Sequence, residues 1–121
     1  MKKEDIQFDI QFYESVLKRL PKDFQTVEML GHLYTSCGEL GKGMKMDELA
    51  VQLRPESPLA HYNLACSLAL MEQSEEALTV LDKAVNLGYD DLDWLLNDED
   101  LLNLHAFPGF IKIVNKLKTN E

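Results

Sequence analysis

The sequence repeats itself at a fixed interval, and this interval constrains the fold more than any other feature. Residues 24–57 can be laid over residues 58–91 without a gap. The period is about 34 residues, and chains with a regular period of about 20–50 residues stack copies of one supersecondary unit. A stack of repeats is therefore expected. The residues that match across the interval are small or apolar: Leu30 with Leu64, Gly31 with Ala65, Gly43 with Ala77, Ala50 with Ala84, Val51 with Val85 and Leu53 with Leu87.

The spacing of apolar residues predicts that the repeating unit is helical. Apolar side chains recur every three or four residues along most of the chain, and no segment alternates apolar and polar residues as a strand does. Pro21 ends the first helix, and Asp23 and Ser57 are expected to cap the helices that begin the two repeats. Three glycines within 38–43 are expected to form a turn between helices, so that the next helix spans 44–53.

Each repeat can be placed position by position on the signature of one repeat family. The signature has large residues at positions 4, 7, 11 and 24 and small residues at positions 8, 20 and 27, where two helices approach closely. The first repeat supplies Val27, Leu30, Gly31, Tyr34, Gly43, Asp47, Ala50 and Pro55. The second supplies His61, Leu64, Ala65, Leu68, Ala77, Leu81, Ala84 and Tyr89. The chain thus resembles the tetratricopeptide repeat family, and the resemblance implies an all-α, right-handed superhelical stack of antiparallel helix pairs, an α-solenoid.

Two departures from the signature carry expectations about packing. Asp47 stands where an aromatic residue belongs, so Met46 or Leu49 is expected to fill that space. His61 replaces the usual tryptophan and is expected to be a packed ring in the core.

The resemblance divides a single domain, residues 1–121, into four parts. Residues 3–21 form an N-terminal helix that resembles the second half of a repeat without its first half. Residues 24–57 and 58–91 are the two repeats, and residues 92–118 form a partial repeat with C-terminal capping helices. Since repeats cannot bury their apolar faces alone, the end helices are expected to act as caps.

The C-terminal part begins like a third repeat and then loses the pattern. Asp98 and Glu99 fall where Leu and a small residue belong, and terminal helices are expected over 98–104 and 108–117. They are expected to cap the second repeat, with a peptide-like plug in the groove as the alternative. The cap is expected to bury the large residues Trp94, Leu101, Leu102, Phe107, Phe110 and Ile113, and to leave Lys112, Lys116 and Lys118 in water.

The resemblance also implies a concave groove lined by the first helix of each repeat. None of the residues expected to line this groove is Lys or Arg. This disfavours a site that clamps the C-terminal carboxylate of a partner. Tyr62, Leu59 and His32 are expected to bury an apolar or amphipathic partner helix, with Asn63 orienting its backbone. The alternative is that terminal helices cover part of this groove. Its expected residues are Gln25, Glu28, Met29, His32, Thr35 and Ser36, then Leu59, Tyr62, Asn63, Cys66, Ala69 and Leu70.

The first helix carries a second apolar pair outside its main stripe. Phe8 and Phe12 lie four residues apart and are offset from the stripe of Ile6, Ile10 and Tyr13. One helix against one neighbour cannot bury both sides. Either the rings are a partly exposed extension of the core face, or they bind a partner or a second copy of the chain.

The charge of the chain selects among classes of partner. Twelve Lys and Arg oppose 21 Asp and Glu, a formal net charge of −9. An acidic chain repels phosphate, so a protein or peptide partner is expected rather than nucleic acid or membrane. Acidic residues concentrated in 90–100 are interpreted as helix-start residues, with a metal site or a basic partner as alternatives.

No catalytic or cofactor site is expected. Cys37 and Cys66 are interpreted as reduced thiols, with a disulfide bridge or a reactive thiol as the alternative. The histidines and cysteines lack metal-ligand spacing, and no Gly-rich phosphate loop follows a strand. The start of the chain lacks the apolar core of a signal peptide. The sequence therefore predicts a non-enzymatic, cytoplasmic protein-binding module, with a structural, self-associating protein as the alternative.

Overall fold

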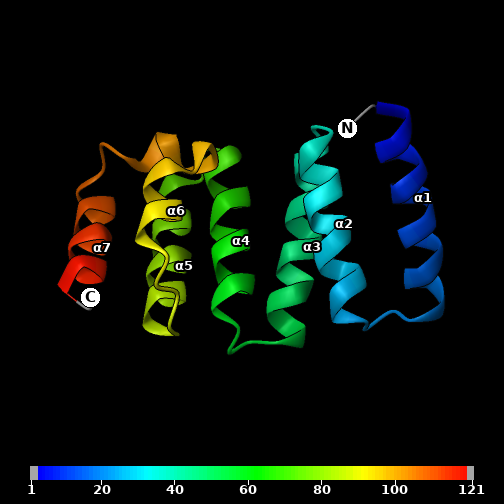
Figure 1. Cartoon of the computed structure of the whole chain (residues 1–121), viewed down its shortest axis with the longest axis horizontal. Helices are drawn as coiled ribbons and strands as arrows, with labels where there is room; N and C mark the ends of the chain where they lie inside the picture. Colours follow the sequence, from blue (N-terminus) through cyan, green and yellow to red (C-terminus); the bar gives the residue numbers. More distant parts are fainter. Residues whose placement is uncertain (1–2, 120–121) are drawn as a thin grey trace. The chain divides into compact units, whose positions relative to one another are not determined.

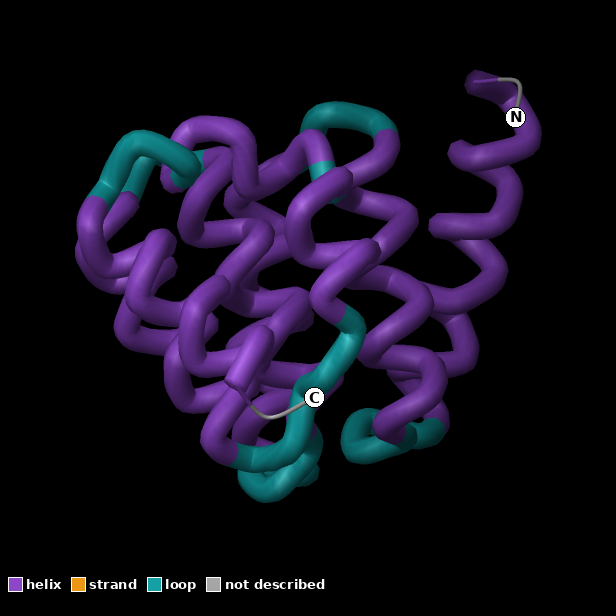
Figure 2. The backbone as a smooth tube through the Cα atoms, turned by 60° about the vertical axis from the view of Figure 1, so that its left-hand side comes forward, coloured by secondary structure: helices purple, strands orange, loops and turns teal. Residues whose placement is uncertain are grey.

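The computed structural model describes residues 3–119, and that range consists of helices joined by turns and loops, without a strand (Figures 1 and 2). The predicted all-α class is confirmed. The elements, in chain order, are α1 (Lys3–Arg19), α2 (Phe24–Ser36), α3 (Leu40–Leu53), α4 (Pro58–Leu70), α5 (Ser74–Asn86), α6 (Leu92–Asn97), the 3-10 helix η1 (Glu99–Leu104) and α7 (Pro108–Thr119).

The chain divides into two compact units, Met1–Pro55 and Glu56–Glu121. The boundary between the units lies close to the predicted boundary between the two repeats, and the single domain of four parts stays a prediction. In unit 1, α2 packs against both α1 and α3. In unit 2, α4 packs against α5 and η1, and α7 packs against α5 and α6.

Helix positions keep the period of the sequence repeat through both units. α1 ends at Arg19 and α3 ends one period later at Leu53, so α1 corresponds to the second helix of a repeat. α7 starts where the second helix of a third repeat is due, so the third repeat is more complete than the sequence predicts. The first helices begin at Phe24, Pro58 and Leu92, and the second helices at Leu40, Ser74 and Pro108.

Side-chain caps explain why the first helix of each repeat begins at the same position of the repeat. An Asp or Ser side chain at the residue before each helix accepts a backbone N–H three residues on, which satisfies a donor that has no partner within the helix. The caps Asp23 and Ser57 are confirmed, and Asp91 supports the helix-start interpretation of the acidic segment. The donors are the backbone N–H groups of Thr26, Ala60 and Trp94, at 3.1, 3.1 and 3.0 Å.

The glycine cluster is divided between a turn and a helix. Gly38 lies in the turn after α2, with φ +86°, where a side chain would be strained. Gly41 and Gly43 lie inside α3, which starts at Leu40 rather than at the predicted Met44. The prediction that the cluster forms a turn is therefore wrong for Gly41 and Gly43.

In unit 1, α2 and α3 approach closely at two glycines. A Cβ atom added to Gly43 would lie 3.2 Å from the carbonyl oxygen of Gly31. This confirms that small residues meet where the helices of repeat 1 cross. Asp47 stands where the signature has an aromatic residue, and Met46 or Leu49 was expected to fill that space. Met46 packs against the buried core cluster around Leu30.

In unit 2, the terminal elements bury part of the expected set. Leu101, Phe110 and Ile113 are buried, whereas Trp94 is 62% exposed and Leu102 is also exposed. Phe107 is also at the surface. Trp94 lies on the short helix α6, which ends after Asn97 and whose buried residue is Leu95.

The expectation of a packed His61 ring is confirmed, and the expectation of water-exposed lysines is confirmed for Lys112 and Lys118. His61 is a buried ring whose Nδ1 lies 2.9 Å from the carbonyl oxygen of Ser57. Lys112 and Lys118 are exposed, and Lys116 forms an ion pair with Asp82 at 2.6 Å. No helix within residues 3–119 is long and apolar enough to cross a membrane.

Candidate partner-binding groove

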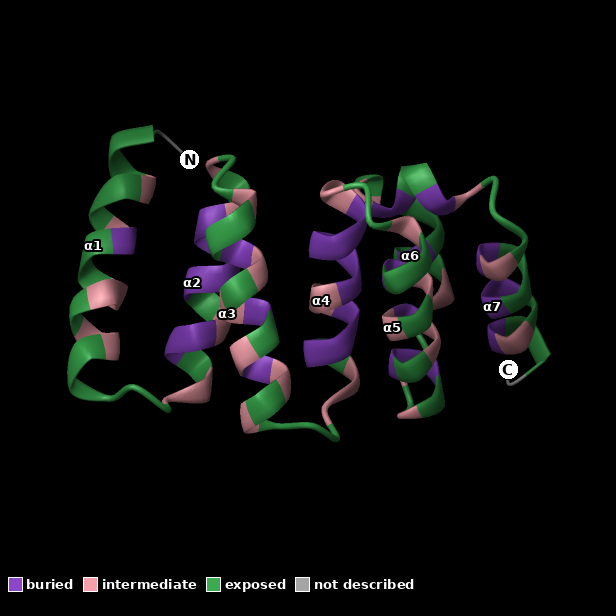
Figure 3. Cartoon of the chain, turned by 180° about the vertical axis from the view of Figure 1, so that it is seen from behind, coloured by how far each residue is buried: buried purple, intermediate pink, exposed green. Residues whose placement is uncertain are grey.

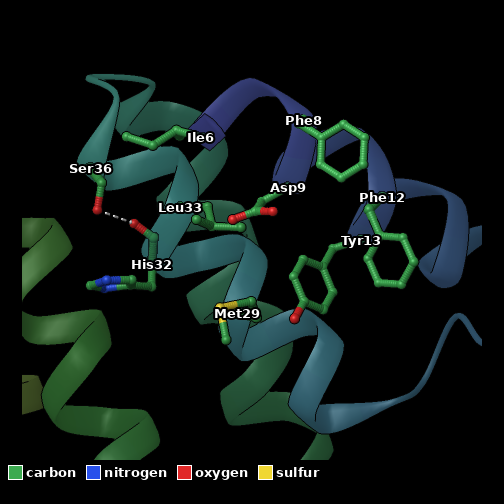
Figure 4. A pocket seen from close by; sticks show the side chains of 9 residues that line it. All are labelled: Ile6, Phe8, Asp9, Phe12, Tyr13, Met29, His32, Leu33 and Ser36. Carbon is green, nitrogen blue, oxygen red and sulfur yellow. Dashed lines mark hydrogen bonds between the residues drawn. The ribbon is translucent and has the colours of Figure 1, made fainter. Parts of the chain in front are cut away.

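An apolar groove of about 760 Å³ lies between α1 and α2 in unit 1 (Figure 4). Both helices contribute side chains to this groove. Its residues are Ile6, Phe8, Asp9, Phe12 and Tyr13 from α1, and Met29, His32, Leu33 and Ser36 from α2.

The groove exists because α1 has two apolar faces and only one is covered. Ile10 is buried against Leu30, Leu33 and Tyr34, as the main stripe predicts. A hydrogen bond of 2.5 Å from the Tyr34 hydroxyl to Glu14 fixes α1 on α2, and burial with this bond raises the pKa of the Tyr34 phenol.

The second apolar face of α1 carries the two phenylalanines. Phe8 is 69% exposed and Phe12 is 54% exposed. The Phe12 ring meets the Tyr13 ring edge to face, with centroids 5.2 Å apart. Two exposed aromatic rings beside a groove do not stabilise the fold by burial, and such apolar patches mark interaction sites.

The structure brings together two residue sets that the sequence treats separately. Met29 and His32 were expected in a partner groove, and Phe8 and Phe12 at a self-association surface. All four line one groove. The spacing of Phe8 and Phe12 indicates an exposed pair, but their position beside Met29 depends on how α1 packs on α2.

In unit 2, the residues expected to line the groove lie largely inside the protein. Tyr62 is only 2% exposed, its hydroxyl donates to Asp98 at 2.6 Å, and its ring stacks on Tyr89 with centroids 4.3 Å apart. The Cys66 thiol is buried and donates to the same carboxylate at 3.6 Å. Burial raises the pKa of the Tyr62 phenol and of the Cys66 thiol, and raises the pKa of Tyr89 to about 12.

The C-terminal segment covers this face of α4. η1 packs against α4, and the Asn103 side chain donates to the carbonyl oxygen of Ala69 at 3.3 Å. Coverage by terminal elements is the alternative that the sequence leaves open, and Tyr62 and Cys66 are interior residues here. The other expected contacts stay predictions: Gln25 and Leu59 are exposed, and Glu28, Asn63 and Leu70 are partly buried.

One cluster in unit 2 could not be recognised from spacing. Donor atoms of Cys66, Asp98 and Asp100 lie within 4.8 Å of one another. A thiol and two carboxylates can ligate a divalent cation. Asp98, however, already accepts hydrogen bonds from Tyr62, from Cys66 and from the backbone N–H of Asp100, which explains the arrangement through the packing of η1.

Comparison with known proteins gives matches in sequence and in fold. No family model matches the chain. Over 83 residues, 69% of the chain, it is 31% identical to Superkiller protein 3 of Saccharomyces cerevisiae. Over 83 residues, 66% of the chain, it is 26% identical to a chloroplastic protein of Arabidopsis thaliana. The chain spans 6% and 25% of these two proteins.

A solved structure supports the same architecture. The crystal structure of MamA superposes with a TM-score of 0.73 at 23% sequence identity, over 95% of this chain and 64% of the MamA chain. At this level of identity the likeness shows the fold.

Proposed function

Because this chain is a tetratricopeptide-like repeat protein, we propose that it is a protein-binding module whose α1–α2 groove takes an apolar or amphipathic helix of a partner. Its fold belongs to a class that serves as a scaffold for protein–protein interaction and is typically non-catalytic. The observation that carries the proposal is the exposure of Phe8 and Phe12, which line the groove. The role includes no catalytic step and fits a cytoplasmic setting.

The energetic argument rests on aromatic surface that water covers in the free protein. A buried aromatic side chain removes about 150–250 Å² from water, and such residues dominate the energetics of interfaces. Phe8 and Phe12 lie one helical turn apart, the spacing at which a partner helix presents its own apolar side chains. Met29 adds a flexible side chain that can adapt to the partner's shape.

The test is affinity capture with a matched control. Full-length protein carrying Phe12→Ser is compared with the wild type for proteins retained from a lysate of the source organism. Specific partners are expected to be retained at least about tenfold less, since central aromatic contacts carry much of the binding energy. Phe107→Ser, at a surface ring of unit 2, is the control and should retain them. Equal capture by the wild type and Phe12→Ser would exclude the groove.

A second candidate function uses the same rings. Self-association through Phe8 and Phe12 is supported by their exposure, because an uncovered apolar face favours pairing. Sedimentation of the wild type beside a Phe8→Asp, Phe12→Asp variant separates the two functions. A wild-type oligomer that the variant dissociates supports assembly, and a monomer in both cases removes it.

A further inference from the structure

A carboxylate, that of Asp9, lines the α1–α2 groove. Figure 4 shows Asp9 directed from α1 toward Leu33 of α2. The side chain is partly buried, and within residues 3–119 it has neither a hydrogen bond nor an ion pair. By contrast, the nearby Glu14 carboxylate on the same helix accepts the Tyr34 hydroxyl.

The formally charged side chain among the described lining residues is acidic. Asp9 is the only carboxylate among the lining residues described, and no Lys or Arg lines the groove with it. Asp5 precedes Asp9 by one turn of α1, and Glu28 is the neighbour of Met29 on α2. The chain as a whole has a formal charge of −9.

Covering the groove would change the surroundings of Asp9. A segment that buries Phe8 and Phe12 also removes water from the carboxylate between them in the sequence. A buried carboxylate without a cation or donors is strongly unfavourable, and a like charge placed opposite it adds repulsion. An occupant must therefore bring a positive group to this point, and an acidic segment is rejected.

We propose that the occupant is an amphipathic helix of a partner protein that carries a Lys or Arg beside its apolar stripe, with that cation paired to Asp9. The proposal rests on the proposed function. The aliphatic stem of Lys or Arg lies along apolar surface while its charged end reaches a carboxylate. Arg also stacks on aromatic rings, and the rings of Phe8, Phe12 and Tyr13 line the groove.

The test measures binding of three designed helical peptides to the full-length protein by fluorescence anisotropy. They share Leu residues at i, i+4 and i+7, and differ in carrying Lys, Gln or Glu beside that stripe. The Lys peptide is expected to bind about tenfold or more tightly than the Glu peptide at low salt, and added salt should reduce the difference.

Variants of the protein test whether the preference for the Lys peptide over the Glu peptide depends on the Asp9 carboxylate. Asp9→Asn should reduce the difference between the Lys and Glu peptides to about threefold or less, and Asp9→Lys should reverse it. Glu4→Gln is the matched control, because it removes one negative charge from an exposed position of α1 outside the groove. Its preference should equal that of the wild type.

The outcomes separate this inference from the function it rests on. If all three peptides bind with equal affinity and Phe12→Ser abolishes binding, the groove function stands and the pairing with Asp9 is overturned. If none binds, or if Phe12→Ser changes nothing, both are overturned. If the wild type sediments as an oligomer that Phe12→Ser dissociates, the occupant is a second copy and the proposal is overturned.

Discussion

At the scale of single residues, the two helices of each repeat cross at close range, and the two repeats use different side chains at this crossing. In repeat 2, the small residues are Ala65 and Ala77, both fully buried. In repeat 1 they are glycines, and the space is used by polar groups: Thr35 Oγ1 donates to the carbonyl oxygen of Gly31 at 2.9 Å. A Cβ on Gly31 would lie 2.6 Å from Asp47 Oδ1. The smaller residues make room for Thr35 and Asp47.

Gly43→Ala tests this crossing. The added methyl would meet Thr35 Oγ1 and the Gly31 carbonyl oxygen, so we expect a loss of about 1–3 kcal/mol from overpacking. Gly41→Ala is the control in the same helix, because nothing lies within 4 Å of its Cβ position. It should stabilise by up to about 1 kcal/mol through helix propensity. Urea unfolding followed by circular dichroism measures both, and equal effects would contradict the crossing.

Glu72 tests the equivalent turn of the second repeat. It lies one repeat period after Gly38 and has φ +61°, a left-handed conformation that disfavours side chains. Gln73 N–H donates to the carbonyl oxygen of Leu68 at 2.9 Å, which fixes this turn. Glu72→Gly should therefore stabilise by about 1 kcal/mol. Glu72→Ala keeps the strain and should gain nothing, and thermal unfolding compares them.

At the scale of elements, Asp98 decides the form of the third repeat. The corresponding residues Leu30 and Leu64 continue their helices, whereas α6 ends before Asp98. The Asp98 side chain accepts the Asp100 N–H at 3.0 Å and so caps η1. η1 then places Leu101 and Leu104 in the core, both fully buried. Because a polar residue stands at a leucine position, the third repeat has two short helices, α6 and η1, where the other repeats have one longer helix.

The Tyr62–Asp98 hydrogen bond is expected to hold η1 on α4. Tyr62→Phe should lower the free energy of unfolding by about 1–2 kcal/mol, because a buried bond to a carboxylate is lost. Tyr13→Phe is the control, since no hydrogen bond of its hydroxyl occurs within residues 3–119, and it should change little. A double-mutant cycle with Asp98→Asn measures the coupling. Additive effects would show that the two side chains do not support each other.

At the scale of the whole molecule, burial is unevenly distributed among the helices. Figure 3 shows α4 mostly in the buried colour and α1 mostly in the exposed colour. Eight residues of α4 are buried, but Ile10 is the buried residue of α1. Local opening is easiest where few apolar contacts must be broken.

Amide hydrogen exchange is expected to follow this distribution. Central amides of α1 should exchange faster than central amides of α4, because opening α1 exposes less buried surface. Mass spectrometry of peptides from the intact protein measures both helices in one sample. A partner bound to the α1–α2 groove should slow exchange in α1 and leave α4 unchanged. Equal protection of the two helices in the free protein would contradict the expectation.

The candidate groove was predictable in its parts and not as a whole. Helical spacing identifies Phe8 and Phe12 as an apolar pair outside the core stripe. It cannot show that they share a groove with Met29, because that depends on the side of α2 against which α1 packs. The burial of Tyr62 could not be predicted for the same reason. Its hydroxyl bonds to Asp98, which lies 36 residues further along the chain.

The sequence by itself determined the helices, because a cap, an apolar stripe and a regular repeat period act over short distances along the chain. It also marked Asp98 as the point where the third repeat changes. The tertiary structure decided which surfaces stay open. Among residues 3–119 it leaves Asp9 without a partner beside exposed rings, and it buries Tyr62, whose hydroxyl bonds to Asp98. Exposure depends on contacts between helices distant in sequence, and periodicity along one helix carries no information about those contacts.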